Sequence, residues 1–236
     1  SSLWAGPLAS HLLWLAGARV VKVESRSRPD AMRDGDAVLF DLLNQGKASV
    51  QADFASVADR EALVALLERA DIVIEASRPR ALRQLGIAAE TILSRRPGQV
   101  WLTITGHGAQ GSPADWVGFG DDCGVAGGLS KALADVTGRP GFVGDAIADP
   151  LTGITAALAG WRQWQSGAGA RLGIAMRGVV AKALHEEQSH DHVALEDELT
   201  GWGAAEGRPF PAVAMRRPMA AVHGLGTDTR EWLATC

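Results

Sequence analysis

The chain alternates short apolar, β-branched runs with longer segments of helical spacing. Three runs have the character of buried strands: "ARVVKVE" (18–24), "DIVIEA" (71–76) and "QVWLTIT" (99–105). Helical segments lie between them, "VADREALVALLERA" (57–70) and "AAETILSRRPG" (88–98). Strands without polar alternation are typical of a parallel sheet that helices cover on both faces through right-handed crossovers. The pattern predicts an α/β fold with a mostly parallel sheet.

The composition excludes several classes of protein. The 236 residues, 47% of them hydrophobic, suffice for one large or two small domains with a core. A net charge of -4 with scattered Lys and Arg gives no basic stripe for nucleic acid or a membrane surface. Only Cys123 and Cys236 are present, and no apolar run or leader pattern indicates a span or a signal peptide. We expect a soluble, cytoplasmic protein.

Ligands of parallel sheets bind beyond the carboxyl ends of the strands, here the loops at 25–37, 76–81 and 106–115. A dinucleotide site would need G-x-G-x-x-G after the first strand, and a Walker A motif would need G-x-x-x-x-G-K-[ST]; neither is present there. The glycines of "TGHGAQGS" (105–112) form a plain turn or let the backbone approach a ligand. Both interpretations stay open at this point.

One carboxylate, Asp149, ends an apolar approach and precedes Pro150 at the start of a helical segment, "GFVGDAIADPLTGITAALAGW" (141–161). An N-cap followed by proline at the first helical position explains this placement on local grounds. A carboxylate is also a nucleophile that needs no neighbouring base, and a helix N-terminus stabilises its charge. Asp145, four residues earlier, is the nearest rival. The residues alone leave the cap and the nucleophile open.

Five segments in order resemble the class III CoA-transferases, the family that includes formyl-CoA and carnitine CoA-transferases and the α-methylacyl-CoA racemases. The segments lie between about residues 2 and 184, and the last fifty residues match only weakly. They are "WAGPLASHLLWLAGARVVKVES", "FDLLNQGKASVQADF", "ADIVIEASRPRALRQLGI", "VWLTITGHGAQG" and "AIADPLTGITAALAG". The order of the segments makes the resemblance specific.

The resemblance implies that Asp149 attacks an acyl-CoA thioester, forms an aspartyl anhydride and is converted to an aspartyl-CoA thioester before a second acid takes the CoA. It implies acyl-CoA and a carboxylic acid as substrates, with no permanently bound cofactor and no metal. It also implies a homodimer, of the kind whose subunits interlock.

The resemblance further implies a set of CoA contacts. Arg33 is preferred over Arg26 and Arg28 for a nucleotide phosphate, since planar guanidinium groups suit phosphate. Ala76 and Ser77 replace the family's usual Asn-Phe pair near the adenine, and a solvated surface charge explains any single arginine equally well. The expected contacts are His11, Arg33, Ser77, Arg78, Arg83, Gly106, His107 and Gly108.

Two other functions compete with CoA transfer. The family's racemases pair the aspartate with a His in a Gly-His-Asp segment, but "WVGFGDDCGVAGG" (116–128) has Gly118 or Phe119 there. A CoA-thioester racemase or isomerase would therefore have to use His107, which stands where the family usually has an aromatic residue. The third function is a non-catalytic subunit that binds CoA esters.

The chain is similar to a short or truncated member of the family, with a Rossmann-like sheet and a reduced second domain or tail. We expect a large domain at 1–184, a linker or remnant of the small domain at 185–215, and a tail at 216–236 that packs on the large domain or a partner subunit. The run "HEEQSHDH" (185–192) is not H-E-x-x-H, which favours a solvated polar linker over a metal site.

Overall fold

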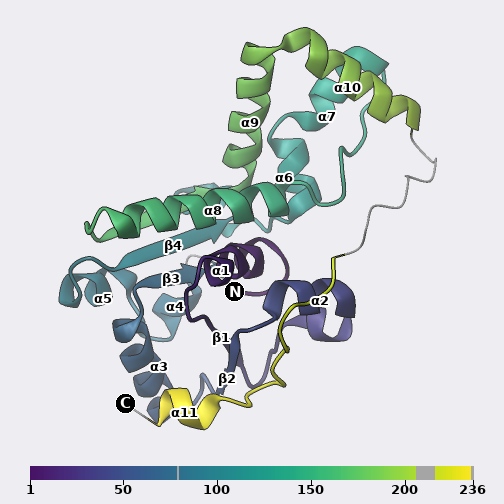
Figure 1. Ribbon diagram of the computed structural model, residues 1–236. Helices are drawn as coiled ribbons and strands as arrows, with labels where there is room; N and C mark the ends of the chain where they lie inside the picture. Colours follow the sequence, from purple (N-terminus) through teal and green to yellow (C-terminus); the bar gives the residue numbers. More distant parts are fainter. Residues whose placement is uncertain (79, 206–215, 235–236) are drawn as a thin grey trace. The chain divides into compact units, whose positions relative to one another are not determined.

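The computed structural model describes residues 1–78, 80–205 and 216–234, and it has the expected α/β class (Figure 1). The strands are β1 (Val21–Ser25), β2 (Ala48–Ala52), β3 (Ile72–Glu75), β4 (Val100–Thr105) and β5 (Ala170–Ala175). The helices are α1 (Ala5–Leu15), α2 (Ala37–Asn44), α3 (Val57–Arg69), α4 (Ala81–Gln84), α5 (Ala89–Arg95), α6 (Gly120–Ala126), α7 (Leu129–Thr137), α8 (Ala148–Gln165), α9 (Met176–His190), α10 (His192–Ala205) and α11 (Thr229–Leu233). Short 3-10 turns occupy η1 (Ala31–Asp34) and η2 (Ser112–Asp115).

The chain divides into two compact units. Unit 1 consists of Ser1–Ile104, Gly153–Gly173 and Arg217–Cys236, and unit 2 of Thr105–Thr152 and Ile174–Arg216. All three strands expected from the sequence are present, as β1, β3 and β4. In the described residues the strands form two sheets, β1-β2 and β3-β4-β5, where the sequence suggested one.

The strand pairs with a defined register are parallel, as the apolar runs predicted. Val21 lies opposite Ala48 in the first sheet, and Ile72 lies opposite Val100 in the second. In unit 1, apolar side chains from α3, α5, β3 and β4 make a core around the fully buried Trp101. The Trp101 Nε1–H donates to Glu75 Oε2 at 3.0 Å, so its polar atom is satisfied within that core.

Residues 217–234 cover one side of β2. The Ser49 N–H donates to Asp228 Oδ2 at 2.7 Å, and the Gln51 N–H donates to Thr229 Oγ1 at 2.9 Å. The Asp228 N–H returns a hydrogen bond to the Ser49 carbonyl at 3.0 Å. The end of the chain therefore supplies partners for backbone groups that an edge strand would leave exposed.

Unit 2 is largely helical, with α6, α7, α9 and α10 labelled in Figure 1. Residues 185–190 belong to α9 and residues 192–205 to α10, so this part of the expected linker is helical. The reason is that α10 carries apolar residues at helical spacing, and Leu199 joins a small core with Ala132 and Leu133 of α7. The rest of the expected linker, 206–215, lies outside the described residues.

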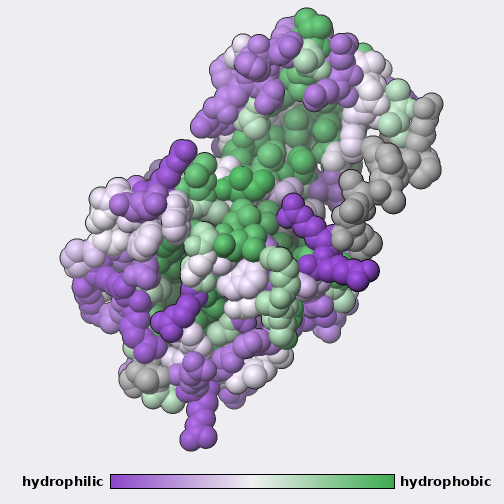
Figure 2. All heavy atoms as spheres, viewed as in Figure 1, coloured by the Kyte–Doolittle hydropathy of each residue, from purple (hydrophilic) through white to green (hydrophobic). Residues whose placement is uncertain are grey.

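The surface of α8 carries apolar side chains at helical spacing. Ile154 is 53% exposed and Leu158 is 47% exposed, and Figure 2 shows hydrophobic surface over this helix. Nevertheless, none of the described helices combines the length and the apolar character that a membrane crossing requires.

Candidate active site

Asp149 is the second residue of α8, which begins at Ala148. It therefore lies within the first helical turn, and the interpretation as an N-cap with Pro150 at the first helical position is wrong by two residues, since Pro150 is the third residue of the helix. The Asp149 N–H donates to the Ala146 carbonyl at 2.8 Å, which forms a tight turn just before the helix. Ala146 has a φ of 47°, a region that costs energy for a residue with a side chain. The half-buried carboxylate thus follows a strained turn.

The first turn of α6 fits closely against this turn. A Cβ at Gly120 would lie 2.4 Å from Asp149 Oδ2 and 2.4 Å from the Ala146 carbonyl oxygen, so only glycine fits there. Asp121 Oδ1 accepts a hydrogen bond from the Ala146 N–H at 2.9 Å. The segment "GFGDD" (118–122) therefore sets the position of the Asp149 carboxylate.

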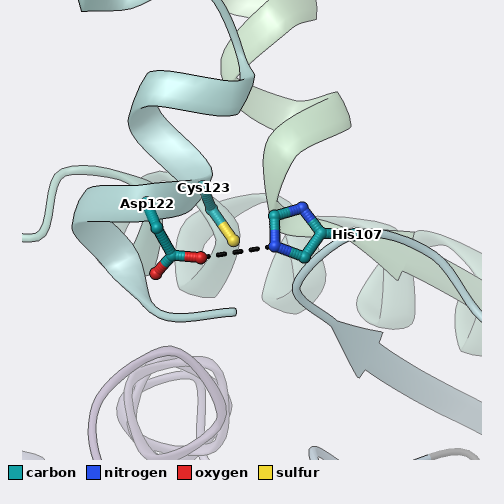
Figure 3. Close-up of side chains that lie close together, drawn as sticks. All are labelled: His107, Asp122 and Cys123. Atoms are coloured by element: carbon teal, nitrogen blue, oxygen red, sulfur yellow. Dashed lines mark hydrogen bonds and ion pairs between the residues drawn. The ribbon is translucent and has the colours of Figure 1, made fainter. Parts of the chain in front are cut away.

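The loop after β4 brings His107 to the same helix α6. Its Nε2 lies 3.3 Å from Asp122 Oδ2 (Figure 3). Trp116 packs edge-on against the imidazole. Asp122 Oδ1 accepts from the Phe119 N–H at 2.7 Å, which fixes the carboxylate. The His107 Nδ1 is buried and has no hydrogen-bond partner among the described residues. Of the two ring nitrogens, Nε2 therefore faces Asp122 and Nδ1 is buried.

Gly106 and Gly108, the other expected contacts of this loop, are in unit 2 with His107 and Asp149. Gly106 packs against Gly118, where a Cβ on Gly106 would come within 2.7 Å of the Gly118 Cα. Gly108 has a φ of 124°, and its N–H donates to Thr105 Oγ1 at 3.2 Å. Gly106 thus serves a close approach between two backbone segments, and Gly108 provides a turn that favours glycine.

Cys123, to which the sequence assigned no role, is fully buried next to this loop. Burial, with the negative charges of Asp122 and Asp149, raises the pKa of the Cys123 thiol to about 12, although the Arg177 N–H and guanidinium act in the opposite direction. The thiol is therefore protonated at neutral pH and is not a nucleophile in this state.

Arg33, the expected phosphate ligand, binds a carboxylate of its own unit. Its Nη2 lies 2.6 Å from Glu24 Oε2 and its Nε 3.0 Å from Oε1, with Phe40 under the guanidinium. Burial raises the pKa of Glu24, but the hydrogen bonds from Arg33 and from the Asp30 N–H, together with the charges of Lys22 and Arg33, bring it below the usual range. The phosphate role stays a prediction, and it competes with a bidentate pair that Glu24 needs.

The remaining expected CoA contacts lie in unit 1. The exposed Ser77 donates to Glu75 Oε1 at 3.1 Å, and the exposed Arg83 pairs with Glu90 at 2.8 Å. Arg78 is also exposed. His11 stacks on Trp14 with ring centroids 5.5 Å apart. Their contacts with CoA stay predictions.

The polar run at 185–192 lies on α9 and at the start of α10 and is exposed throughout. His192 lies 3.5 Å from Glu196 on the surface of α10. In the ranges that the structure describes, these histidines form no cluster of metal-ligand type. Their expected solvation is confirmed, although in helices.

Comparison with known proteins connects this geometry to one family. The family described as "CoA-transferase family III" matches residues 1–217. A succinyl-CoA:mesaconate CoA-transferase of Haloarcula hispanica is 31% identical over 172 residues, which cover 65% of this chain and 42% of the relative. A formyl-CoA:oxalate CoA-transferase of Afipia carboxidovorans is 29% identical over 221 residues, which cover 87% of this chain and 51% of the relative.

Solved structures give the same result. A CAIB/BAIF family protein from Brucella suis superimposes with a TM-score of 0.73 at 27% identity, over 82% of this chain and 55% of the other. The hypothetical protein Rv3272 from Mycobacterium tuberculosis superimposes with a TM-score of 0.71 at 26% identity, over 82% of this chain and 56% of the other. The chain spans about half the length of the curated relatives it matches. The family match along nearly the whole sequence shows that this chain belongs to CoA-transferase family III.

Proposed function

We propose that the chain carries the catalytic aspartate of a CoA-transferase that moves CoA from an acyl-CoA to a carboxylic acid. An Oδ atom of Asp149 attacks the acyl carbonyl carbon, the carbon–sulfur bond breaks, and CoA leaves as a thiolate. The thiolate then attacks the Asp149 Cγ of the anhydride and expels the first acid as a carboxylate. The product of this half-reaction is an aspartyl-CoA thioester.

The second half-reaction runs the same chemistry in reverse. The carboxylate of the accepting acid attacks the Asp149 Cγ and expels the thiolate, which leaves a new mixed anhydride. The thiolate attacks the acyl carbon of that acid, which forms the new acyl-CoA and frees the Asp149 carboxylate. No proton is gained or lost over the cycle. A site of this kind needs a carboxylate and no general base.

One observation carries the proposal: the Asp149 carboxylate lies against Gly120, the first residue of α6, which has no side chain. A Cβ there would be 2.4 Å from Oδ2, so the backbone of α6 approaches the carboxylate more closely than any other residue would permit. Family membership supports the chemistry, since the relatives carry the names of CoA-transferases. Both ring nitrogens of His107 are buried or paired with Asp122, which gives no support to a racemase.

The proposal includes the partners of the reaction. Acyl-CoA and a carboxylic acid are the substrates, and the resemblance to the family supports a homodimer as the active form. Of the expected CoA contacts, Arg78 is the exposed guanidinium best suited to a phosphate, because Arg33 and Arg83 already pair with carboxylates.

The test is intact mass spectrometry of the full chain incubated with a panel of acyl-CoAs and hydroxylamine, which traps an activated carboxylate as a hydroxamate. We expect a hydroxamate on Asp149 with the acyl-CoAs that the site accepts. The variant Asp149→Ala should form none. The variant Asp145→Ala is the matched control, since Asp145 is an exposed carboxylate of the same turn and should leave the adduct unchanged.

The absence of any adduct, with CoA binding retained in calorimetry, would overturn the proposal. It would favour a chain that binds CoA esters without turnover. An adduct that persists in Asp149→Ala would place the reactive carboxylate elsewhere.

A further inference from the structure

Three side chains of unit 2 direct electron-pair donors toward one small space. They are the imidazole of His107, the carboxylate of Asp122 and the thiol of Cys123, and one donor atom of each lies within 4.8 Å of the other two (Figure 3). His107 comes from the loop after β4, whereas Asp122 and Cys123 come from the first turns of α6. Imidazole, carboxylate and thiolate are the three ligand types of zinc sites.

The separation of two donor atoms suits a small cation. Zinc bonds of about 2.1 Å to nitrogen and oxygen in a tetrahedral site place the two donor atoms about 3.4 Å apart. His107 Nε2 and Asp122 Oδ2 are 3.3 Å apart, which is long for a strong hydrogen bond. The other Asp122 oxygen is held by the Phe119 N–H, as outer contacts of metal ligands commonly are.

Gly118 keeps this space open. A Cβ at Gly118 would lie 2.9 Å from Cys123 Sγ and 2.9 Å from His107 Nε2. Any side chain there would therefore occupy the volume that both donor atoms face. Asp122 is half exposed while His107 and Cys123 are buried, so Asp122 is the member of the group that contacts water.

The local charge also suits a cation. The Asp122 carboxylate is one of the three donors, and the Asp149 carboxylate lies against Gly120 of the same helix α6. A divalent cation interacts favourably with carboxylates and with a thiolate.

We propose that His107 Nε2, Asp122 Oδ2 and Cys123 Sγ bind one divalent cation of the zinc class, with water in a fourth position on the exposed side. On binding, the Cys123 S–H bond breaks, a sulfur–metal bond forms, and the proton passes to solvent. This site goes beyond the proposed function, because neither step of CoA transfer at Asp149 requires it.

Cobalt(II) is the probe, because a thiolate bound to it gives charge-transfer absorption in the near ultraviolet. The full chain is used with Cys236→Ser, so that Cys123 is the only thiol. We expect absorption that saturates at one cobalt per chain, release of one proton per cobalt, and bleaching on addition of zinc. Cys123→Ser should lose the band, and Asp122→Asn and His107→Phe should each weaken cobalt binding by about tenfold or more.

Control variants change residues that lie outside the three ligands. Asp145→Asn and His185→Ala replace exposed ligand-type residues elsewhere in unit 2 and should leave the cobalt affinity unchanged. Asp149→Ala should retain the charge-transfer band and lose the hydroxamate. The cation site and the catalytic role of Asp149 can therefore be refuted independently of each other. Circular dichroism identifies any variant that does not fold.

Two results would overturn the inference. One is the absence of thiolate–cobalt absorption in the folded chain with Cys123 intact. The other is an affinity that stays unchanged in both Asp122→Asn and His107→Phe, which would leave a thiol that binds cobalt without the other two ligands.

Discussion

Two groups of ionisable side chains, one in each unit, differ in how their charges are balanced. On β1 and η1 of unit 1, Lys22 lies 2.7 Å from Asp30, and Arg33 lies 2.6 Å from Glu24. Burial alone would raise the pKa values of Asp30 and Glu24, but the cations beside them bring both below the usual range. Each carboxylate has a direct counter-charge, so we expect this group to act on stability.

In unit 2 the acidic side chains near Cys123 have no such balance of charge in their effect on the thiol. Burial raises the pKa of Cys123, Asp122 and Asp149 raise it further, and the opposing charge of Arg177 does not compensate. Negative charge gathered around a protonated thiol is a poor way to stabilise a fold, and it is suited to an electrophile or a cation. The difference is that each carboxylate of the unit 1 group lies beside a cation, whereas the acidic side chains around Cys123 outweigh Arg177 in their effect on the thiol.

The largest expected effect tests the unit 2 side of the comparison. Asp149→Asn removes the nucleophilic oxygen but keeps the size of the side chain. We expect trapping by hydroxylamine to fall by roughly a thousandfold or more, while the free energy of unfolding changes by about 1 kcal/mol or less. Mass spectrometry measures the rate of trapping, and urea denaturation measures the free energy of unfolding. If Asp149→Asn lowered the free energy of unfolding as much as we expect for Glu24→Gln, the two groups of side chains would not differ in their effect on stability.

Glu24→Gln tests the unit 1 side. It leaves Arg33 partly buried without its carboxylate, so we expect a loss of about 3 kcal/mol in the free energy of unfolding. Urea denaturation measures it. Asp135→Asn is the control, because the Lys131–Asp135 pair is exposed at both ends and should contribute about 0.5 kcal/mol or less. Equal effects in the two variants would contradict the comparison.

Low pH should remove the stability that the Glu24 and Asp30 carboxylates contribute. Since the folded-state pKa values of Glu24 and Asp30 are lowered, their contribution is present above the unfolded-state pKa values, near 4, and is lost as the pH falls through the folded values. We expect the free energy of unfolding to fall below about pH 5, and to fall less steeply in Glu24→Gln. Urea titrations at several pH values give the slope, and parallel slopes for the two proteins would refute this assignment.

The smallest effect concerns the C-terminal segment. Asp228→Asn weakens the bond from the Ser49 N–H and the 2.6 Å contact with His223 Nδ1, so we expect a loss of about 1 kcal/mol. Hydrogen exchange should quicken at the Ser49 and Gln51 amides and stay unchanged at Trp101. Uniform exchange changes would show that the segment does not act locally on β2.

Local sequence patterns sufficed for much of the fold. The strands that became β1, β3 and β4, and the helices α3 and α5, follow from apolar runs and helical spacing. The helix α10 was not predicted, because the polar run before it is typical of a linker. Leu195, Leu199 and Trp202 nevertheless repeat at helical spacing and pack with α7. The signal was present in the sequence.

Less of the candidate site could be predicted from the sequence. The place of Asp149 at the start of a helix was predicted, but its position within the first turn depends on a turn at Ala146 that no local rule indicates. The pairing of Arg33 with Glu24 joins residues nine positions apart through a turn, and His107 meets Asp122 across fifteen. Such contacts depend on which backbone segments glycines allow to meet, and one sequence does not reveal that.

The hydrogen bonds between residues 226–229 and β2 also bear on how the protein is made. During synthesis from the N-terminus, β2 leaves the ribosome long before Asp228 and Thr229 exist, so its outer amides at Ser49 and Gln51 lack their final partners. The nascent chain thus carries an open strand edge until the codons for these residues have been translated. A prematurely terminated chain would keep that edge, and it would be a natural target for chaperones and proteases.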